Sequence, residues 1–142
     1  MARSLTFWLA APEASQLDPG DIPLALGALL VRVARADFRY VIAEIEMIDA
    51  ILALRHDLTR AEATEMRRIC ERLESGAPET ERFAQVLRAA VPYGDRLAIA
   101  LCLWEVMMAD GIQHPQEQAV IDLAEAILGI RVQDVGQAYA PA

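Results

Sequence analysis

The sequence feature that most constrains the fold is an internal repeat at an offset of 73 residues. When residues 24–53 are aligned with residues 97–126, ten of the thirty positions are identical. Shared helical periodicity would match apolar residues, but it would not place three acids in register. Those acid pairs are Asp37/Asp110, Glu44/Glu117 and Asp49/Asp122. The sequence therefore predicts two related helix–loop–helix units, at about 22–58 and 95–135.

Apolar residues recur at intervals of three and four along the chain, which is the period of an amphipathic helix. No run alternates apolar and polar residues over six or more positions, so strands are not expected. We predict an all-α, single-domain bundle of about seven or eight helices with a pseudo-two-fold repeat. Residues 1–21 are predicted to form a short helix and linker, and residues 22–142 the helical domain. The expected helices are 3–10, 22–36, 42–55, 60–75, 79–91, 94–109, 115–128 and 132–139.

Composition and charge exclude several classes of protein. With 55% hydrophobic residues the chain is expected to fold, and its net charge of −8 disfavours nucleic-acid phosphates and anionic membranes as partners. No segment reaches the roughly 18 uncharged apolar residues of a membrane span. The N-terminal apolar stretch is too short for a signal peptide, so we expect a cytoplasmic protein. Cys70 and Cys102 lack metal-site spacing and are predicted to be buried thiols.

The loop of the second unit has recognisable turn chemistry. Gly111 can adopt the left-handed conformation that ends a helix, and Pro115 suits the first position of the next helix. His114 is then the N-cap, and Glu117 is the third helical residue, where a carboxylate can accept a backbone N–H bond. One interpretation of Glu117, and of Glu44 in the first unit, is therefore a capping carboxylate.

A second interpretation rests on where these carboxylates point. At 100° per residue, Glu117 faces the apolar arc of its helix, and Glu44 lies between Ile48 and Ile51. A carboxylate that faces the core needs a partner, because its unpaired burial is costly. We expect the first unit to neutralise its acids with its own arginines. Those arginines are Arg32, Arg35, Arg39 and Arg55.

The second unit has no basic residue between Leu97 and Ile130. Clusters rich in oxygen and poor in sulfur suit hard cations such as Ca²⁺, Mg²⁺ or Mn²⁺. We therefore hypothesise a divalent-cation site at Asp110 and Glu117. We expect His114 to be a cap or surface residue and not a ligand. Enzymatic activity is not expected, because no Ser or Cys is suitably placed beside a His for nucleophilic catalysis.

These residues resemble a known family. A helix that ends in Met108-Ala109-Asp110-Gly111, followed by Glu117 and Leu128-Gly129-Ile130, resembles the TerB-like tellurite-resistance proteins, as does the Val91-Pro92-Tyr93 junction. That family shares its fold with the N-terminal region of the membrane-anchored DjlA-type co-chaperone. The resemblance covers about residues 22–135 and implies an all-α bundle with a pseudo-repeat. It also implies a link to tellurite or stress resistance.

The family's acids are suspected metal ligands, and the resemblance carries that role to four positions here. Those positions are Asp37, Glu44, Asp110 and Glu117. The first unit departs from the family pattern, because Phe38 follows Asp37 where the pattern has glycine. A bulky residue tolerates the left-handed conformation poorly. We therefore expect a different loop shape in the first unit and place the site in the second.

Two functional hypotheses follow from the sequence. The first is a non-enzymatic, cation-binding helical domain of a stress-response system. The alternative is a metal-free protein–protein interaction module, similar to a co-chaperone or scaffold, that docks a partner helix in an apolar groove between the units. Trp104, Met107 and Met108 are candidates for lining that groove, although ordinary core packing also explains them.

Overall fold

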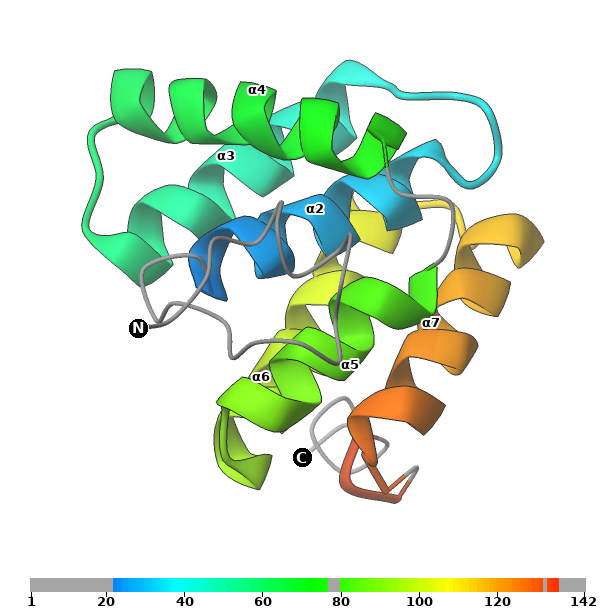
Figure 1. Cartoon of the computed structure of the whole chain (residues 1–142). Helices are drawn as coiled ribbons and strands as arrows, with labels where there is room; N and C mark the ends of the chain where they lie inside the picture. Colours follow the sequence, from blue (N-terminus) through cyan, green and yellow to red (C-terminus); the bar gives the residue numbers. More distant parts are fainter. Residues whose placement is uncertain (1–21, 77–79, 132, 136–142) are drawn as a thin grey trace, which may run out of the picture.

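A computed structural model describes residues 22–76, 80–131 and 133–135 of the chain (Figure 1). In these ranges the chain is all-α, with six named helices, a further helical stretch at 133–135 and no strand. The helices are α2 (Ile22–Arg35), α3 (Ile42–His56), α4 (Arg60–Gly76), α5 (Thr80–Ala90), α6 (Tyr93–Met107) and α7 (Pro115–Leu128). The all-α prediction is confirmed, and these helices match their predicted ranges to within two residues at each end. The predicted helices at 3–10 and 132–139 lie wholly or largely outside the described residues.

Helix α2 is the centre of the bundle and packs against each of the other five helices. In Figure 1 it runs through the middle of the molecule, with α4 on one side and α5 on the other. Its sequence, IPLALGALLVRVAR, is apolar on nearly every face, and most of its side chains are fully buried. A helix that is hydrophobic all round is stable only where other helices surround it. This composition therefore explains why the first helix of the first unit becomes the core of the domain.

Local capping chemistry sets several helix ends. Thr59 and Glu62 form the expected capping box at the start of α4, because each side chain accepts a hydrogen bond from the other's backbone N–H. At the end of α7, Gly129 has a left-handed φ of 71°. Arg96 and Arg88 donate hydrogen bonds to the last carbonyls of that helix. The C-terminal end of a helix carries partial negative charge, so positively charged side chains are favoured there. Helix α7 is thus anchored to both α5 and α6.

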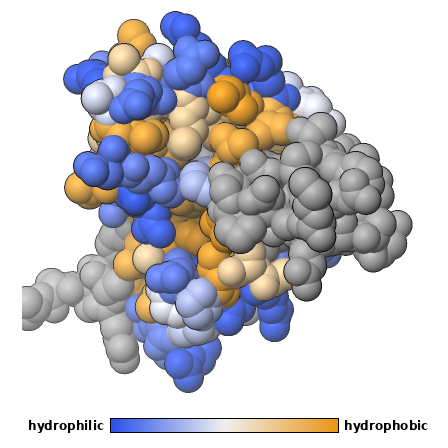
Figure 2. Space-filling model, turned by 60° about the vertical axis from the view of Figure 1, so that its left-hand side comes forward, coloured by the Kyte–Doolittle hydropathy of each residue, from blue (hydrophilic) through white to orange (hydrophobic). Residues whose placement is uncertain are grey.

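On the face seen in Figure 2, hydrophilic side chains alternate with apolar patches. None of the described helices is long and apolar enough to cross a membrane. The two cysteines are buried free thiols, as expected. Burial raises the pKa of Cys70 to about 12, so this thiol stays protonated at neutral pH. The repeat and the division of the chain at residue 22 stay predictions from the sequence.

Close packing between α2 and α4 depends on Gly27. A Cβ atom at this position would lie 2.3 Å from the Sγ atom of Cys70, which is itself fully buried. We expect Gly27→Ala to lower the free energy of unfolding by about 1–3 kcal/mol, the usual cost of overpacking a core. Gly94→Ala is the matched control, because no atom lies within 4 Å of that Cβ position. Urea unfolding of the two variants tests this, and equal stabilities would contradict the packing described here.

Candidate metal centre

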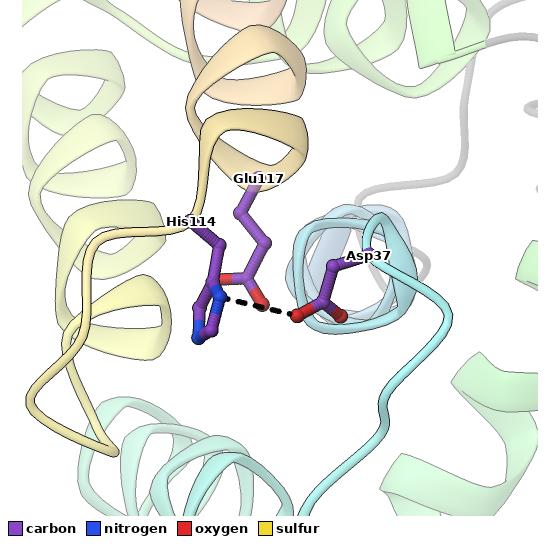
Figure 3. Close-up of side chains that lie close together, drawn as sticks. All are labelled: Asp37, His114 and Glu117. Carbon is purple, nitrogen blue, oxygen red and sulfur yellow. Dashed lines mark ion pairs between the residues drawn. The ribbon is translucent and has the colours of Figure 1, made fainter.

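The loop that follows α2 and the loop that follows α6 meet at one end of the bundle, and the acids of both units meet there. His114 is the last residue before α7, and its ring contacts an aspartate from each of the two loops. Its Nδ1 atom is 3.4 Å from Oδ2 of Asp37, and its Nε2 atom is 2.9 Å from Oδ2 of Asp110. Figure 3 shows His114 and Glu117 reaching from α7 and its preceding loop toward Asp37. The structure therefore brings the first-unit and second-unit acids into one cluster.

The two loops share a local conformation. Asp37 accepts a hydrogen bond from the backbone N–H of Arg39, and Asp110 accepts one from that of Ile112, each at 3.0 Å. The residues between them have left-handed backbones, with φ of 63° at Phe38 and 79° at Gly111. The expectation that Phe38 would change the loop's shape is therefore wrong. The side chain of an aspartate favours this turn when it accepts a hydrogen bond from the backbone N–H two residues later. Here that bond keeps even a phenylalanine in the left-handed conformation.

A polar network anchors the end of the first loop to α4. The hydroxyl of Tyr40 donates a 2.6 Å hydrogen bond to Glu71, and Arg67 binds both Glu71 at 2.8 Å and Asp49 at 2.6 Å. Asp49 is only 8% exposed and also accepts a bond from Thr64. Asp49 is therefore neutralised inside the bundle. This network fixes the chain that follows Asp37 and helps explain the strained turn at Phe38.

Glu44 and Glu117 are the most deeply buried acids of the cluster, at 1% and 0% exposure. One oxygen of Glu44 accepts the Val41 N–H at 3.2 Å, so its capping role is confirmed. The capping interpretation of Glu117 is wrong, because neither of its oxygens has a hydrogen-bond partner among the described residues. The second oxygen of Glu44 also lacks one. Helical spacing directs Glu117 into the core, away from the free N–H groups at the start of α7.

Burial, together with repulsion from neighbouring acids such as Asp37 and Asp110, raises the pKa values of both glutamates. Burial is the largest cause for each, and the carboxyl of Glu44 adds to the effect on Glu117, raising its pKa to about 9. Each of the two carboxyls influences the pKa of the other, and neighbouring buried carboxylates are costly to ionise together without a balancing positive charge. The cluster therefore holds either an extra proton or another positive charge at neutral pH.

The expected neutralisation of the first-unit acids by local arginines is wrong. Arg32 and Arg35 bind Glu74 instead, and Arg55 lies beside the Sγ atom of Cys102. Among the described residues, no arginine forms an ion pair with any of the four predicted ligands. The arginines near these acids in sequence point away because α2 and α3 present them to α4 and α6.

His114 is the site residue that the sequence analysis missed. It is the N-cap of α7, as predicted, but its side chain makes no cap bond and turns into the cluster. The hydrogen bond to Asp110 raises the pKa of His114 and lowers that of Asp110. The signal in the sequence is its spacing, four residues after Asp110 and three before Glu117.

Three residues of the cluster form a candidate metal site. Asp37, His114 and Glu117 each offer a ligand atom, and these atoms all lie within 4.8 Å of one another. Ligands on opposite sides of a divalent cation are separated by about 4–5 Å, twice the usual metal–ligand distance. Both oxygens of Glu117 are buried and lack a hydrogen-bond partner among the described residues. These three residues are therefore a candidate cation site.

The left-handed turn at Phe38 gives a test of the loop's strain. We expect Phe38→Gly to raise the free energy of unfolding by about 0.5–1 kcal/mol, because glycine removes a steric cost of about 1–2 kcal/mol and adds a smaller entropic one. Phe38→Ala is the control, since it removes the exposed ring but keeps the steric cost. Thermal unfolding of both variants measures this. A gain from alanine as large as that from glycine would show that the backbone is not strained.

A protein-family model described as "Tellurite resistance protein TerB" matches residues 23–140. This range covers more than half of the chain and includes every residue of the acidic cluster. No match was found among curated proteins or among solved structures.

Proposed function

The chain belongs to the TerB family of tellurite resistance proteins, and from this premise we propose that it is a non-enzymatic helical domain that binds one divalent cation. The cation would sit where the two loops meet. The proposal rests above all on Glu117, a fully buried carboxylate whose two oxygens lack partners in the described structure. Burying such a group charged and unpaired costs roughly several kcal/mol of folding free energy. A cation bound to it would therefore stabilise the folded chain.

Each residue of the cluster has a defined part in the proposed site. Asp37, His114 and Glu117 would supply the first ligands, because their donor atoms already converge. Glu44 is a further candidate ligand because its second oxygen is buried without a partner, although its atoms are not among those that converge. Asp110 holds the Nε2 atom of His114, which leaves the Nδ1 atom directed at Asp37. Carboxylates commonly orient a ligating histidine in this way.

The mixed donor set favours Mn²⁺ among the cations considered. Ca²⁺ and Mg²⁺ prefer oxygen ligands alone, whereas Mn²⁺ also accepts an imidazole nitrogen. Zn²⁺ fits the same donors and belongs in any comparison of cations. In the cell, we propose that cation loading at this position links the domain to metal stress and to the resistance for which the family is named.

Cation binding should stabilise the folded chain. At a cation concentration of about 100 times Kd, we expect about 2.7 kcal/mol of added stability, measured as a rise in Tm over the EDTA-treated protein. The double variant Asp110→Asn with Glu117→Gln should lose this rise, because it removes one ligand and the group that orients another. Mn²⁺, Ca²⁺, Mg²⁺ and Zn²⁺ should be titrated separately.

The control for that experiment removes two acids outside the cluster. Glu105 and Asp122 are exposed, so Glu105→Gln with Asp122→Asn changes the net charge equally and should leave the cation effect intact. A Tm that no cation raises, or an equal loss in both double variants, would contradict the proposed site.

The cation-free protein should lose stability as the pH rises. Because the folded-state pKa of Glu117 lies near 9, above its ordinary value of 4.5, the folded chain holds a proton that the unfolded chain releases across this range. The free energy of unfolding in EDTA should therefore fall between about pH 4.5 and pH 9. Glu117→Gln should flatten this slope, since a neutral amide can stay beside Glu44 at any pH. Urea unfolding at several pH values tests this, and identical slopes in both proteins would contradict the burial of Glu117 described above.

A further inference from the structure

The two loops that meet at the acidic cluster have the same backbone pattern. In each loop an aspartate accepts a hydrogen bond from the backbone N–H two residues later, and a residue with a left-handed backbone stands between them. The N-cap of the next helix comes four residues after the aspartate and is extended in both cases. Three residues further on is a buried glutamate, Glu44 in α3 and Glu117 in α7. The fold therefore presents the same set of backbone positions twice.

One side chain breaks this correspondence, and it lies at the N-cap. The N-cap of α7 is His114, whereas the N-cap of α3 is Val41. The Nδ1 atom of His114 is directed at Asp37, and its Nε2 atom is held at 2.9 Å by Asp110. A valine side chain has no atom with a lone pair to offer a metal ion. The α3 side of the cluster is therefore one ligand short.

Ligand atoms accordingly converge on one side of the cluster. Among the described residues, a single group of three places its ligand atoms within 4.8 Å of one another, and this group consists of Asp37, His114 and Glu117 (Figure 3). Exchanging the two loops gives the counterpart of that group, which is Asp110, Val41 and Glu44. The counterpart has two carboxylates and no third ligand. Its aspartate is already bonded to His114, and one oxygen of its glutamate accepts the backbone N–H of Val41.

The number of ligands decides which side can hold an ion. Three protein ligands and an open position are the arrangement of catalytic zinc sites, so the α7 side has enough donors for a divalent cation. The α3 side has one ligand fewer, and its two carboxylates are partly engaged in other bonds. The second oxygen of Glu44 is buried and has no hydrogen-bond partner among the described residues. This oxygen is the donor that a complete counterpart would use.

We propose that Val41 limits the cluster to a single divalent cation, which lies on the α7 side. Asp110 and Glu44 then form the incomplete counterpart of that site, and the residue at position 41 decides how many ions the chain binds. This inference rests on the proposed cation site and adds to it the number of ions and the residue that sets this number.

The test replaces Val41 by histidine and counts the bound ions. The original chain and Val41→His are dialysed to equilibrium against Mn²⁺, and the metal content per chain is measured by inductively coupled plasma mass spectrometry. We expect one Mn²⁺ per chain for the original protein and two for Val41→His, a twofold increase. Electron paramagnetic resonance shows whether the ions are neighbours, because two Mn²⁺ ions in one cluster couple magnetically and an ion bound elsewhere on the surface does not.

Two control variants and a second test variant accompany this measurement. Val41→Leu changes the same position without adding a ligand, and Ile112→His adds a histidine where the side chain is 57% exposed on the second loop. Both controls should keep one Mn²⁺ per chain. Val41→Asp is the second test variant, because aspartate offers a carboxylate ligand and is a preferred N-cap residue. It should also bind two coupled Mn²⁺ ions, and it decides the question if Val41→His does not fold.

The outcomes separate this inference from the proposed function. One Mn²⁺ per chain in the original protein and in the folded histidine or aspartate variant would overturn the role of Val41 and leave the cation site standing. Two coupled Mn²⁺ ions in the original chain or in either control would also overturn it, because the second ion would then need no ligand at position 41. An original chain that binds no Mn²⁺ would overturn the proposed function and this inference together.

Discussion

The account depends on one electrostatic constraint, the burial of Glu44 and Glu117 side by side. The helix starts of α3 and α7 place these carboxylates in the apolar interior, where water cannot solvate them. The pKa values of both groups rise for that reason, so the folded chain must hold a positive charge there, either as a proton or as a cation. We propose a cation in this role, since Asp37 and His114 bring additional donor atoms to the same point.

The bundle supplies this constraint through its central helix. Because α2 packs against α3, α4, α5, α6 and α7, its end fixes the position of Asp37 relative to α7. The Tyr40–Glu71–Arg67 network holds the following loop against α4, and Arg96 holds the far end of α7 against α6. The cluster is therefore preorganised by contacts that lie outside it. This is the arrangement that a rigid ion site requires.

Much of the fold could be predicted from the sequence because its causes are local. Helical periodicity, the Thr59–Glu62 capping box and the Gly111 and Pro115 turn signals fix where helices begin and end. The site could be predicted only in part, because three of its features depend on tertiary packing. The direction in which Arg32 and Arg35 point is set by Glu74 on α4. The side chain of His114 turns inward only because Asp37 and Asp110 converge around it. The turn at Phe38 contradicts its intrinsic preference, because the aspartate bond and the Tyr40 anchor together hold it in place.

The most direct test of the central claim is a crystal structure of the chain grown with Mn²⁺, with anomalous diffraction used to locate the metal. The account predicts one strong anomalous peak where the two loops meet, at about 2.0–2.3 Å from Glu117, Asp37 and the Nδ1 atom of His114. It would be contradicted by a cluster without a peak, in which Glu44 and Glu117 hydrogen bond to each other while Mn²⁺ binds only at exposed acids such as Glu46.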